Sequence, residues 1–383
     1  MSLVNHGAFL VSEELTEKSN LALLDCTLRE GSYAVDFQFD EGFVTRLLAR
    51  LNETPMPMVE IGHGIGLEAE RAGIKAGNID HFRWCELANE TLTKKPWGMF
   101  AQPEFTRLST IAEMTARGMS FVRVGMEPDR VQANLDYLRR AIETCPAVYL
   151  NLMKSSATPI EDFRTMLEGV PEGIAGVYVV DSYGAMLPAD VRRYVTAVSQ
   201  MFPTVGFHGH DNLGLATVNS VCAWQSGAAI VDGTLDGIGR GSGNAPVESL
   251  AGIVNLIDDD VFDYREMAKL AQFTRSSLEL VVDNRMMQVL GGVIGIHSGY
   301  FPLVEQLAER CGTEPAHLMA TAVRLAEQSA RPADIQAAAE QIAADLQRLP
   351  HQKDTLRLDQ PQTPVDPDDV VTADAITLAK IAA

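Results

Sequence analysis

The stretch Val205-Gly206-Phe207-His208-Gly209-His210-Asp211-Asn212 joins an apolar run to two histidines that are separated by one residue. Residues i and i+2 of a β-strand point to the same face, so this spacing predicts that the His208 and His210 imidazoles lie side by side. Such a pair is either the start of a divalent-metal site or a hydrogen-bonded pair without a metal. The rest of the chain decides between these interpretations.

Seven further apolar segments occur along the chain and alternate with helical patterns. Many are continuous apolar runs, which are typical of parallel strands that are buried on both faces. The predicted strands cover residues 21–28, 58–62, 97–101, 121–125, 147–153, 176–180, 204–208 and 230–235. The amphipathic stretches between them include residues 41–52, 107–117, 131–143, 159–167, 188–199 and 213–225.

Eight strands, each followed by a helix, predict an α/β fold of the (β/α)8 TIM-barrel type. A doubly wound open sheet is the alternative, but it normally has a Gly-rich fingerprint after the first strand. This chain has Asp25-Cys26-Thr27-Leu28-Arg29-Glu30-Gly31 at that place. We therefore expect a barrel domain over residues 15–262.

The strand pattern stops near Asp263, and the remaining chain is rich in Ala, Leu, Glu and Gln. We expect a helical domain over residues 263–349 and an extended tail over residues 350–383. Within the helical domain, Gly291–Gly295 is expected to form a flexible or tightly packed connector. The predicted helices are Tyr264–Leu290, Phe301–Cys311, Pro315–Gln328 and Pro332–Arg348.

The composition limits the function classes. The net charge of the 383 residues is −20, with both signs mixed, which argues against nucleic acid or an anionic membrane as the main partner. The N-terminus lacks the pattern of a signal peptide, and no apolar run is long enough for a membrane span. The five cysteines are scattered without a CxxC pair, which indicates reduced thiols and a cytoplasmic location.

Barrel enzymes carry their sites at the C-terminal ends of the strands, where this chain has many polar residues. One carboxylate, two imidazoles and an amide at one end of the barrel suit a six-coordinate site for Mn²⁺, Mg²⁺ or a similar ion. Lys154 could instead form a Schiff base, and the Gly239–Gly243 loop could hold phosphate, but we favour a metal and a tight turn near it. The strand-end residues are Arg29, Glu30, His63, Arg123, Lys154, Asp181, Ser182, His208, His210 and Asn244.

Two separated motifs resemble the DRE-TIM metallolyases, namely Asp25-x-Thr27-Leu28-Arg29-Glu30-Gly31 and His208-x-His210. This superfamily includes 4-hydroxy-2-oxovalerate aldolases, hydroxymethylglutaryl-CoA lyases and isopropylmalate, homocitrate and citramalate synthases. The stretch from Asp232-Gly233-Thr234-Leu235 through Gly239-x-Gly241-x-Gly243-Asn244-Ala245-Pro246-x-Glu248 is most similar to the aldolases.

The resemblance implies that Glu30, His208 and His210 bind a divalent metal, with Mn²⁺ favoured and Mg²⁺, Co²⁺ or Zn²⁺ as alternatives. It implies that Arg29 holds the 2-oxo acid and stabilises an enolate, a task that suits a planar, permanently charged group. Ser182, His63 and Asn244 are the further substrate-binding candidates, and Asn244 is also a candidate metal ligand. For His63, a hydrogen-bonded role within its own turn is an equal alternative. The expected reaction is aldol cleavage of a 4-hydroxy-2-oxo acid to pyruvate and an aldehyde. The resemblance also suggests an acylating aldehyde dehydrogenase as partner, and we expect a homo-oligomer.

The chain departs from these aldolases at two positions. They have a histidine base four residues after the strand-one arginine, where this chain has Tyr33, and a tyrosine in the helical domain, where this chain has His297. We hypothesise that Tyr33 and His297 face each other over the substrate and that His297 is the base, because imidazole titrates near neutral pH. The alternative is a different substrate with a different base.

Other functions remain open at this point. One alternative is a Claisen condensation of an acyl-CoA with a 2-oxo acid, as in the synthases, or a reaction like that of hydroxymethylglutaryl-CoA lyase. The synthases generally follow the strand-one motif with Glu-Gln, whereas Ser32-Tyr33 follows Gly31 here. A non-catalytic, partner-binding subunit is a third interpretation, which the intact Arg29, Glu30, His208 and His210 disfavour.

Overall fold

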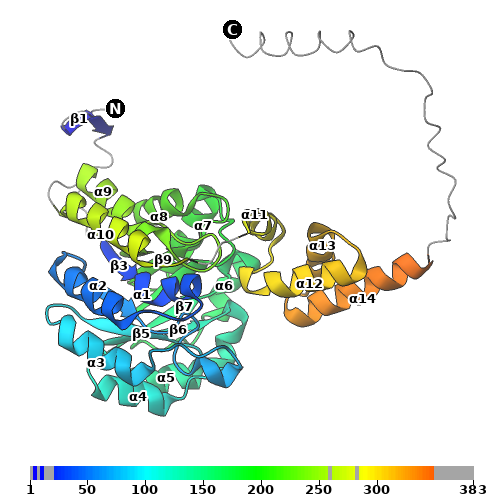
Figure 1. Cartoon of the computed structure of the whole chain (residues 1–383), viewed down its shortest axis with the longest axis horizontal. Helices are drawn as coiled ribbons and strands as arrows, with labels where there is room; N and C mark the ends of the chain where they lie inside the picture. Colours follow the sequence, from blue (N-terminus) through cyan, green and yellow to red (C-terminus); the bar gives the residue numbers. More distant parts are fainter. Residues whose placement is uncertain (1–2, 7–8, 13–20, 258–260, 281–283, 349–383) are drawn as a thin grey trace, which may run out of the picture. The chain divides into compact units, whose positions relative to one another are not determined.

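Eight parallel strands form a closed barrel in the computed structural model (Figure 1), which describes residues 3–6, 9–12, 21–257, 261–280 and 284–348. The strand order β10-β3-β4-β5-β6-β7-β8-β9 confirms the predicted TIM barrel. The strands are β3 (Ala22–Cys26), β4 (Met58–Ile61), β5 (Trp97–Ala101), β6 (Phe121–Met126), β7 (Ala147–Leu152), β8 (Gly176–Asp181), β9 (Val205–Gly209) and β10 (Ile230–Gly233). Each lies within about two residues of its predicted range. A separate antiparallel pair, β1 (Leu3–His6) and β2 (Phe9–Ser12), precedes the barrel.

Helices follow the strands and surround the barrel (Figure 1). Their apolar faces pack on the outer face of the sheet and form one large core that includes Leu23, Val122 and Phe207. A smaller cluster with Leu24, Phe121 and Tyr178 is a second part of the apolar core. These helices are α2 (Glu41–Glu53), α3 (His81–Thr91), α4 (Leu108–Ala116), α5 (Leu135–Thr144), α6 (Ile160–Met166), α7 (Pro188–Ser199), α8 (Ala216–Gln225) and α9 (Val247–Ile257).

The helical region differs from its prediction at two places. The single helix predicted over Tyr264–Leu290 is wrong, because α10 (Tyr264–Ser277) ends well before α11 (Arg285–Ile294) begins. α10 contacts α2 and α9, and its Phe273 ring stacks on Phe43 at 5.6 Å. The domain boundary at residue 263 stays a prediction.

The connector predicted over Gly291–Gly295 is also wrong for all but its last residue. Residues 291–294 are helical, and Gly295 ends α11 in a left-handed conformation with φ 89°. A Cβ on Gly291 would lie 2.4 Å from the Phe301 ring, so this glycine allows a close helix contact rather than a flexible joint. A second apolar cluster begins at Met287 and joins α11 to α12 (Phe301–Cys311), α13 (Pro315–Leu325) and α14 (Pro332–Arg348). The tail predicted over residues 350–383 lies outside the described residues.

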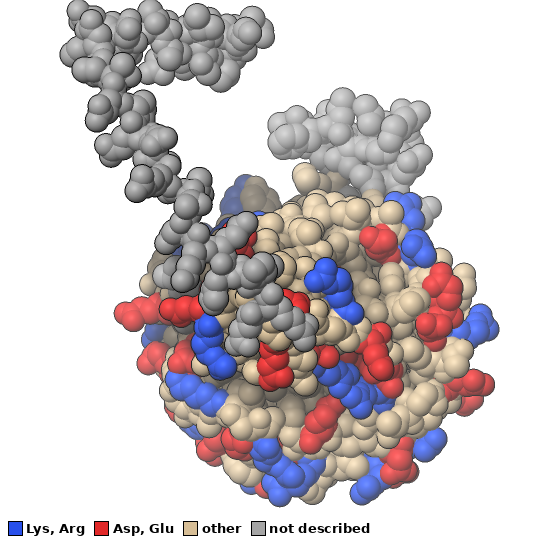
Figure 2. All heavy atoms as spheres, turned by 90° about the vertical axis from the view of Figure 1, so that its right-hand side faces the viewer, with Lys and Arg blue, Asp and Glu red and all other residues tan. Residues whose placement is uncertain are grey.

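The described surface carries charges of both signs. On the face shown in Figure 2, acidic and basic side chains are interspersed. Among the described helices, none has by itself the length and apolar composition of a membrane span. Only the bent pair Arg285–Ile294 and Ser298–Cys311 meets those criteria, when both are counted together across an angle of 119°.

Gly98 offers a test of how tightly β5 and β6 pack. A Cβ at this position would lie 2.3 Å from the Phe121 ring and 2.4 Å from the Phe121 carbonyl oxygen. We expect Gly98→Ala to lower the free energy of unfolding in urea by about 1–3 kcal/mol or more, because a backbone atom cannot yield easily. Gly252→Ala in α9 is the control, since no atom lies within 4 Å of its Cβ position and Ala favours helix. Equal stability of the two variants would contradict the tight packing.

Candidate active site

A cavity of about 350 Å³ lies at the C-terminal ends of the barrel strands. Strand ends supply most of its lining, and the loop between α11 and α12 supplies His297, Gly299 and Tyr300. The predicted site residues that line it together are Arg29, Glu30, Tyr33, Ser182, His208, His210 and His297.

Glu30, His208 and His210 form a cluster of candidate metal ligands. The three side chains are buried, and one ligand atom from each lies within 4.8 Å of the other two. His208 and His210 stand at the end of β9, as their spacing predicts, and Glu30 ends the short helix α1 (Thr27–Glu30) after β3. Asp25 makes this turn by accepting hydrogen bonds from the Thr27 N–H at 3.1 Å and from the Thr27 hydroxyl at 2.8 Å.

Hydrogen bonds orient both imidazoles. The Nδ1–H of His208 donates to Asp232 at 2.8 Å, and the Nδ1–H of His210 donates to the Gly243 carbonyl at 3.3 Å. Carboxylate and carbonyl oxygens only accept hydrogen bonds, so the Nδ1 atom of each ring carries the proton. The Nε2 atom of each ring therefore keeps an electron pair that can bind a metal. The glycine-rich loop after β10 thus forms the expected tight turn beside the cluster, with φ 82° at Gly243.

The protonation states suit a cation. Burial raises the pKa of Glu30, but the adjacent Arg29 guanidinium prevails and lowers it to about 2. Burial lowers the pKa of His210 to about 4. At neutral pH the carboxylate is therefore charged and this imidazole neutral, which are the forms that bind metals.

Two buried oxygens support the fit of a metal. Glu30 Oε2 and Asn244 Oδ1 have no hydrogen-bond partner among the described residues. Such atoms are expensive unless an ion or water satisfies them. A second group, Cys26 with His208 and Asp232, also lies close together. It fits a metal poorly, because burial raises the pKa of the Cys26 thiol well above its usual range and the Arg123 cation contacts both Cys26 and Asp232.

Arg29 is held in place from two sides. Its Nε donates to Glu60 at 2.7 Å, its Nη1 donates to Glu30, and its guanidinium lies 4.9 Å from the centre of the Phe100 ring. Arg123, expected near a strand end, lies instead inside the barrel in the middle of β6. It is fully buried and donates to Glu60 at 2.7 Å and 2.8 Å and to Asp232.

Ser182 and Lys154 meet on another side of the cavity. The Ser182 oxygen accepts a hydrogen bond from the Lys154 backbone N–H at 2.8 Å, which leaves its own O–H available to a ligand. The Lys154 ammonium lies 2.8 Å from Glu127. A side chain engaged in this ion pair is not free to attack a carbonyl group, which disfavours the Schiff-base alternative.

The remaining substrate-binding candidates occupy different places. His63 does not line this cavity, because its Nε2 bonds the Lys75 carbonyl at 3.0 Å and its Nδ1 accepts from the Ile65 N–H at 3.2 Å. Its ring also stacks on Phe37 at 4.2 Å. The hydrogen-bonded interpretation of His63 therefore agrees with the structure better than the substrate-facing one. Asn244 pairs with His210 through a β-bridge, which places it beside the metal cluster.

Tyr33 and His297 line the same cavity, with Arg240 near both. The Arg240 guanidinium lies 4.8 Å from the centre of the Tyr33 ring. Burial raises the pKa of Tyr33, so it is a neutral phenol at pH 7. Burial, Arg240 and Lys154 lower the pKa of His297 well below its usual range. Of the two, only His297 has the form of a base at neutral pH.

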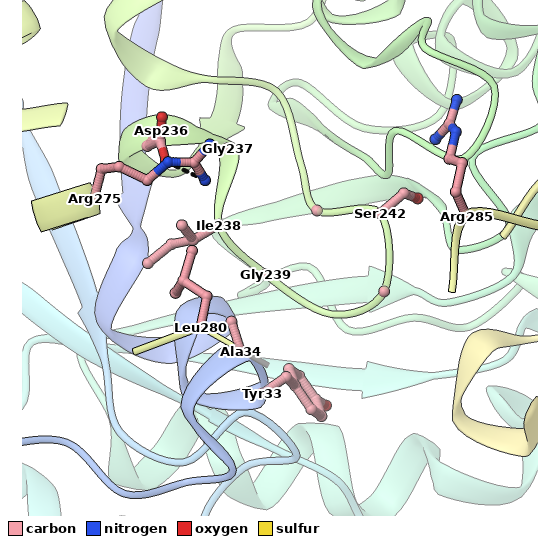
Figure 3. A pocket seen from close by; sticks show the side chains of 12 residues that line it. Tyr33, Ala34, Asp236, Gly237, Ile238, Gly239, Ser242, Arg275, Leu280 and Arg285 are labelled. Atoms are coloured by element: carbon pink, nitrogen blue, oxygen red, sulfur yellow. Dashed lines mark ion pairs between the residues drawn. The ribbon is translucent and has the colours of Figure 1, made fainter. Parts of the chain in front are cut away.

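A second cavity of about 390 Å³ lies along the 236–243 loop. Tyr33 lines both cavities. Figure 3 shows the Asp236–Arg275 ion pair, 3.1 Å long, toward one side of the second cavity and Arg285 toward the other.

No role for Glu60, Asp232 or Arg240 was predicted from the sequence. A signal existed for the first two and for Arg123, since each is a charge inside an apolar strand. A charge in a strand that is buried on both faces indicates a buried partner. Arg240 carried no such signal, because a charged residue in a loop is ordinary.

If Glu30, His208 and His210 bind the metal, substitution of one of them should weaken metal binding by a large factor. We expect His210→Ala to weaken Mn²⁺ binding at least about 100-fold, because it removes one of three ligands and second-shell changes alone cost 10–100-fold. His63→Ala, outside the cavity, should bind Mn²⁺ like the parent protein. Calorimetric titration after chelator treatment measures both, and equal affinities would exclude His210 as a ligand.

Several known proteins are similar to this chain in sequence or in fold. Oxaloacetate decarboxylase of Mycobacterium tuberculosis is 31% identical over 82% of this chain and 94% of its own length. The 4-hydroxy-2-oxovalerate aldolase of Thermomicrobium roseum is 29% identical over 77% of this chain and 84% of its own. The carboxyl transferase domain of Rhizobium etli pyruvate carboxylase shares the fold, with a TM-score of 0.69, 14% identity and coverage of 87% of this chain and 62% of that one. The HMGL-like family model matches residues 20–273. The chain belongs to the HMGL-like family, which confirms the resemblance drawn from its motifs.

Proposed function

We propose that the protein is a divalent-metal-dependent lyase that cleaves a 4-hydroxy-2-oxo acid to pyruvate and an aldehyde. The observation that carries this proposal is the cavity in which Arg29, the Glu30–His208–His210 cluster and a neutral His297 occur together. Relatives named as 4-hydroxy-2-oxovalerate aldolases support it. The dehydrogenase partner and the homo-oligomer stay predictions.

The protein's own groups have separate tasks. A metal held by Glu30, His208 and His210 would supply the Lewis acidity that polarises the 2-oxo group. Arg29 keeps N–H donors beyond those used by Glu30 and Glu60, and these can hold the substrate oxygens on which negative charge develops. The Ser182 hydroxyl is a further donor for the carboxylate.

The proton transfers fall to His297 and Tyr33. His297 removes the proton of the 4-hydroxyl, and the C3–C4 bond breaks. The electron pair of that bond goes to C3, which gives the aldehyde and the enolate of pyruvate. A proton then adds to C3. Protonated Tyr33, which lines the same cavity, or the imidazolium of His297 can donate it.

Decarboxylation of oxaloacetate is a second candidate, favoured by the relative of that name. Loss of CO₂ leaves the same enolate, but it requires no base because no hydroxyl proton is removed. The same cavity could therefore serve both reactions, and they differ in their need for His297.

Pyruvate release tests the lyase class. We expect 4-hydroxy-2-oxo acids to yield pyruvate with Mn²⁺ and none above background after chelation. Arg29→Lys should lower kcat/KM at least about 100-fold, because Lys lacks the planar fork that holds the developing charge. Pyruvate release at an undiminished rate in chelator would contradict the metal requirement. Its absence from every chain length, with metal bound, would point to a condensation or to another substrate.

His297→Ala separates the two reactions. Aldol cleavage should fall at least about 100-fold while oxaloacetate decarboxylation falls much less, because only the first needs a base. Since the pKa of His297 lies below its usual range, the base is already neutral at pH 7. Hence kcat/KM for cleavage should be flat near neutrality and should decline only as pH drops through that lowered pKa. Unchanged cleavage in His297→Ala with its loss in Tyr33→Phe would reverse the assignment.

A further inference from the structure

The cations that line the cavity differ in their contacts with carboxylates. Arg29 contacts the carboxylates of Glu30 and Glu60, and Lys154 contacts that of Glu127. Arg240 has no carboxylate within 4.0 Å in the described part of the chain. Among the described residues, the half-buried Arg240 is therefore influenced by Glu30 through the electrostatic field but contacts no carboxylate directly.

The fold holds Arg240 in a defined place. Its guanidinium lies over the Tyr33 ring at 4.8 Å. A Cβ on Gly299 would lie only 1.7 Å from Arg240 Nη2, so the guanidinium packs directly against this glycine and an added side chain would displace it. The same Cβ position is 3.3 Å from His297 Nδ1, which makes the guanidinium a close neighbour of the proposed base.

We propose that Arg240 binds a second carboxylate, so that the substrate is a 4-hydroxy-2-oxo acid whose aldehyde half is itself acidic. This inference rests on the proposed function. Arg29 beside the metal cluster serves the pyruvate half, whereas His297 acts on the 4-hydroxyl. A cation next to His297 therefore faces the substituents of C4 rather than the 2-oxo acid end.

The positive charge of Arg240 should also affect the energy barriers of aldol cleavage and decarboxylation differently. In aldol cleavage the second carboxylate is unchanged: the 4-hydroxyl proton goes to His297, the C3–C4 electron pair goes to C3, and C3 gains a proton. In decarboxylation the second carboxylate loses its charge as CO₂. An arginine that stabilises this charge binds the ground state better than the transition state and so raises that barrier. The products expected are pyruvate and a 2-oxo or aldehyde acid.

The test compares substrates that differ in one group. 4-Hydroxy-2-oxoglutarate and 4-hydroxy-2-oxovalerate carry a carboxylate and a methyl group, respectively, on C4. We expect the unaltered enzyme to prefer the first, and Arg240→Gln to lower the ratio of their kcat/KM values by about 30-fold or more, because a desolvated ionic contact is lost. Arg275→Gln, which removes an arginine from the second cavity, is the control and should leave this ratio unchanged.

A binding measurement makes the inference independent of turnover. 2-Oxoglutarate and 2-oxopentanoate differ in the same way and lack the 4-hydroxyl, so they bind without being cleaved. With Mn²⁺ present, Arg240→Gln should weaken 2-oxoglutarate binding at least about tenfold more than 2-oxopentanoate binding. Equal losses for both ligands would overturn the inference. If pyruvate forms from 4-hydroxy-2-oxovalerate but not from 4-hydroxy-2-oxoglutarate, the inference fails while the lyase function stands. If neither gives pyruvate, the proposed function fails, and the titration alone decides the role of Arg240.

Discussion

The carboxylate of Glu60 holds two arginines at once, and the geometry of the candidate site depends on it. It accepts hydrogen bonds from Arg29 Nε at 2.7 Å and from Arg123 at 2.7 Å and 2.8 Å. Arg123 also donates to Asp232, which accepts from His208. A continuous series of buried, alternating charges thus connects Arg29, the proposed substrate-binding arginine, to His208, a proposed metal ligand. Removing one member would leave an uncompensated buried charge, which costs about 3–5 kcal/mol.

The helical region contributes residues to the cavity at the ends of the barrel strands. His297 comes from the α11–α12 loop, and contacts of this region with the barrel place it at the cavity. Glu127 accepts from the Ser329 hydroxyl at 2.8 Å, and the Asn212 amide donates to the Gln288 carbonyl at 3.0 Å. The strand ends therefore supply the groups proposed to stabilise an enolate, whereas loops supply the proposed base and the residue proposed to select the substrate. This division agrees with barrel folds that host several chemistries by varying their loops.

The sequence predicted the barrel and the close approach of Glu30, His208 and His210 well for physical reasons. Strands buried on both faces are continuous apolar runs, and the His208-x-His210 spacing is fixed by the two-residue period of a strand. Contacts between segments that are distant in the sequence were harder to predict. His63 makes its hydrogen bonds within its own turn, and the helix expected over Tyr264–Leu290 is interrupted. The position of Arg240 is evident only from its contacts with Tyr33 and Gly299. These features depend on tertiary packing, which neither periodicity nor a local motif encodes.

If this cavity stabilises the enolate of pyruvate as we propose, hydrogen exchange at the pyruvate methyl group tests it without knowledge of the aldehyde. In D₂O with Mn²⁺, we expect the protein to remove the methyl proton signal of pyruvate far faster than the buffer does. Chelator or Arg29→Lys should largely abolish this exchange. A protein that binds Mn²⁺ and pyruvate yet gives no exchange above the buffer rate would contradict the claim.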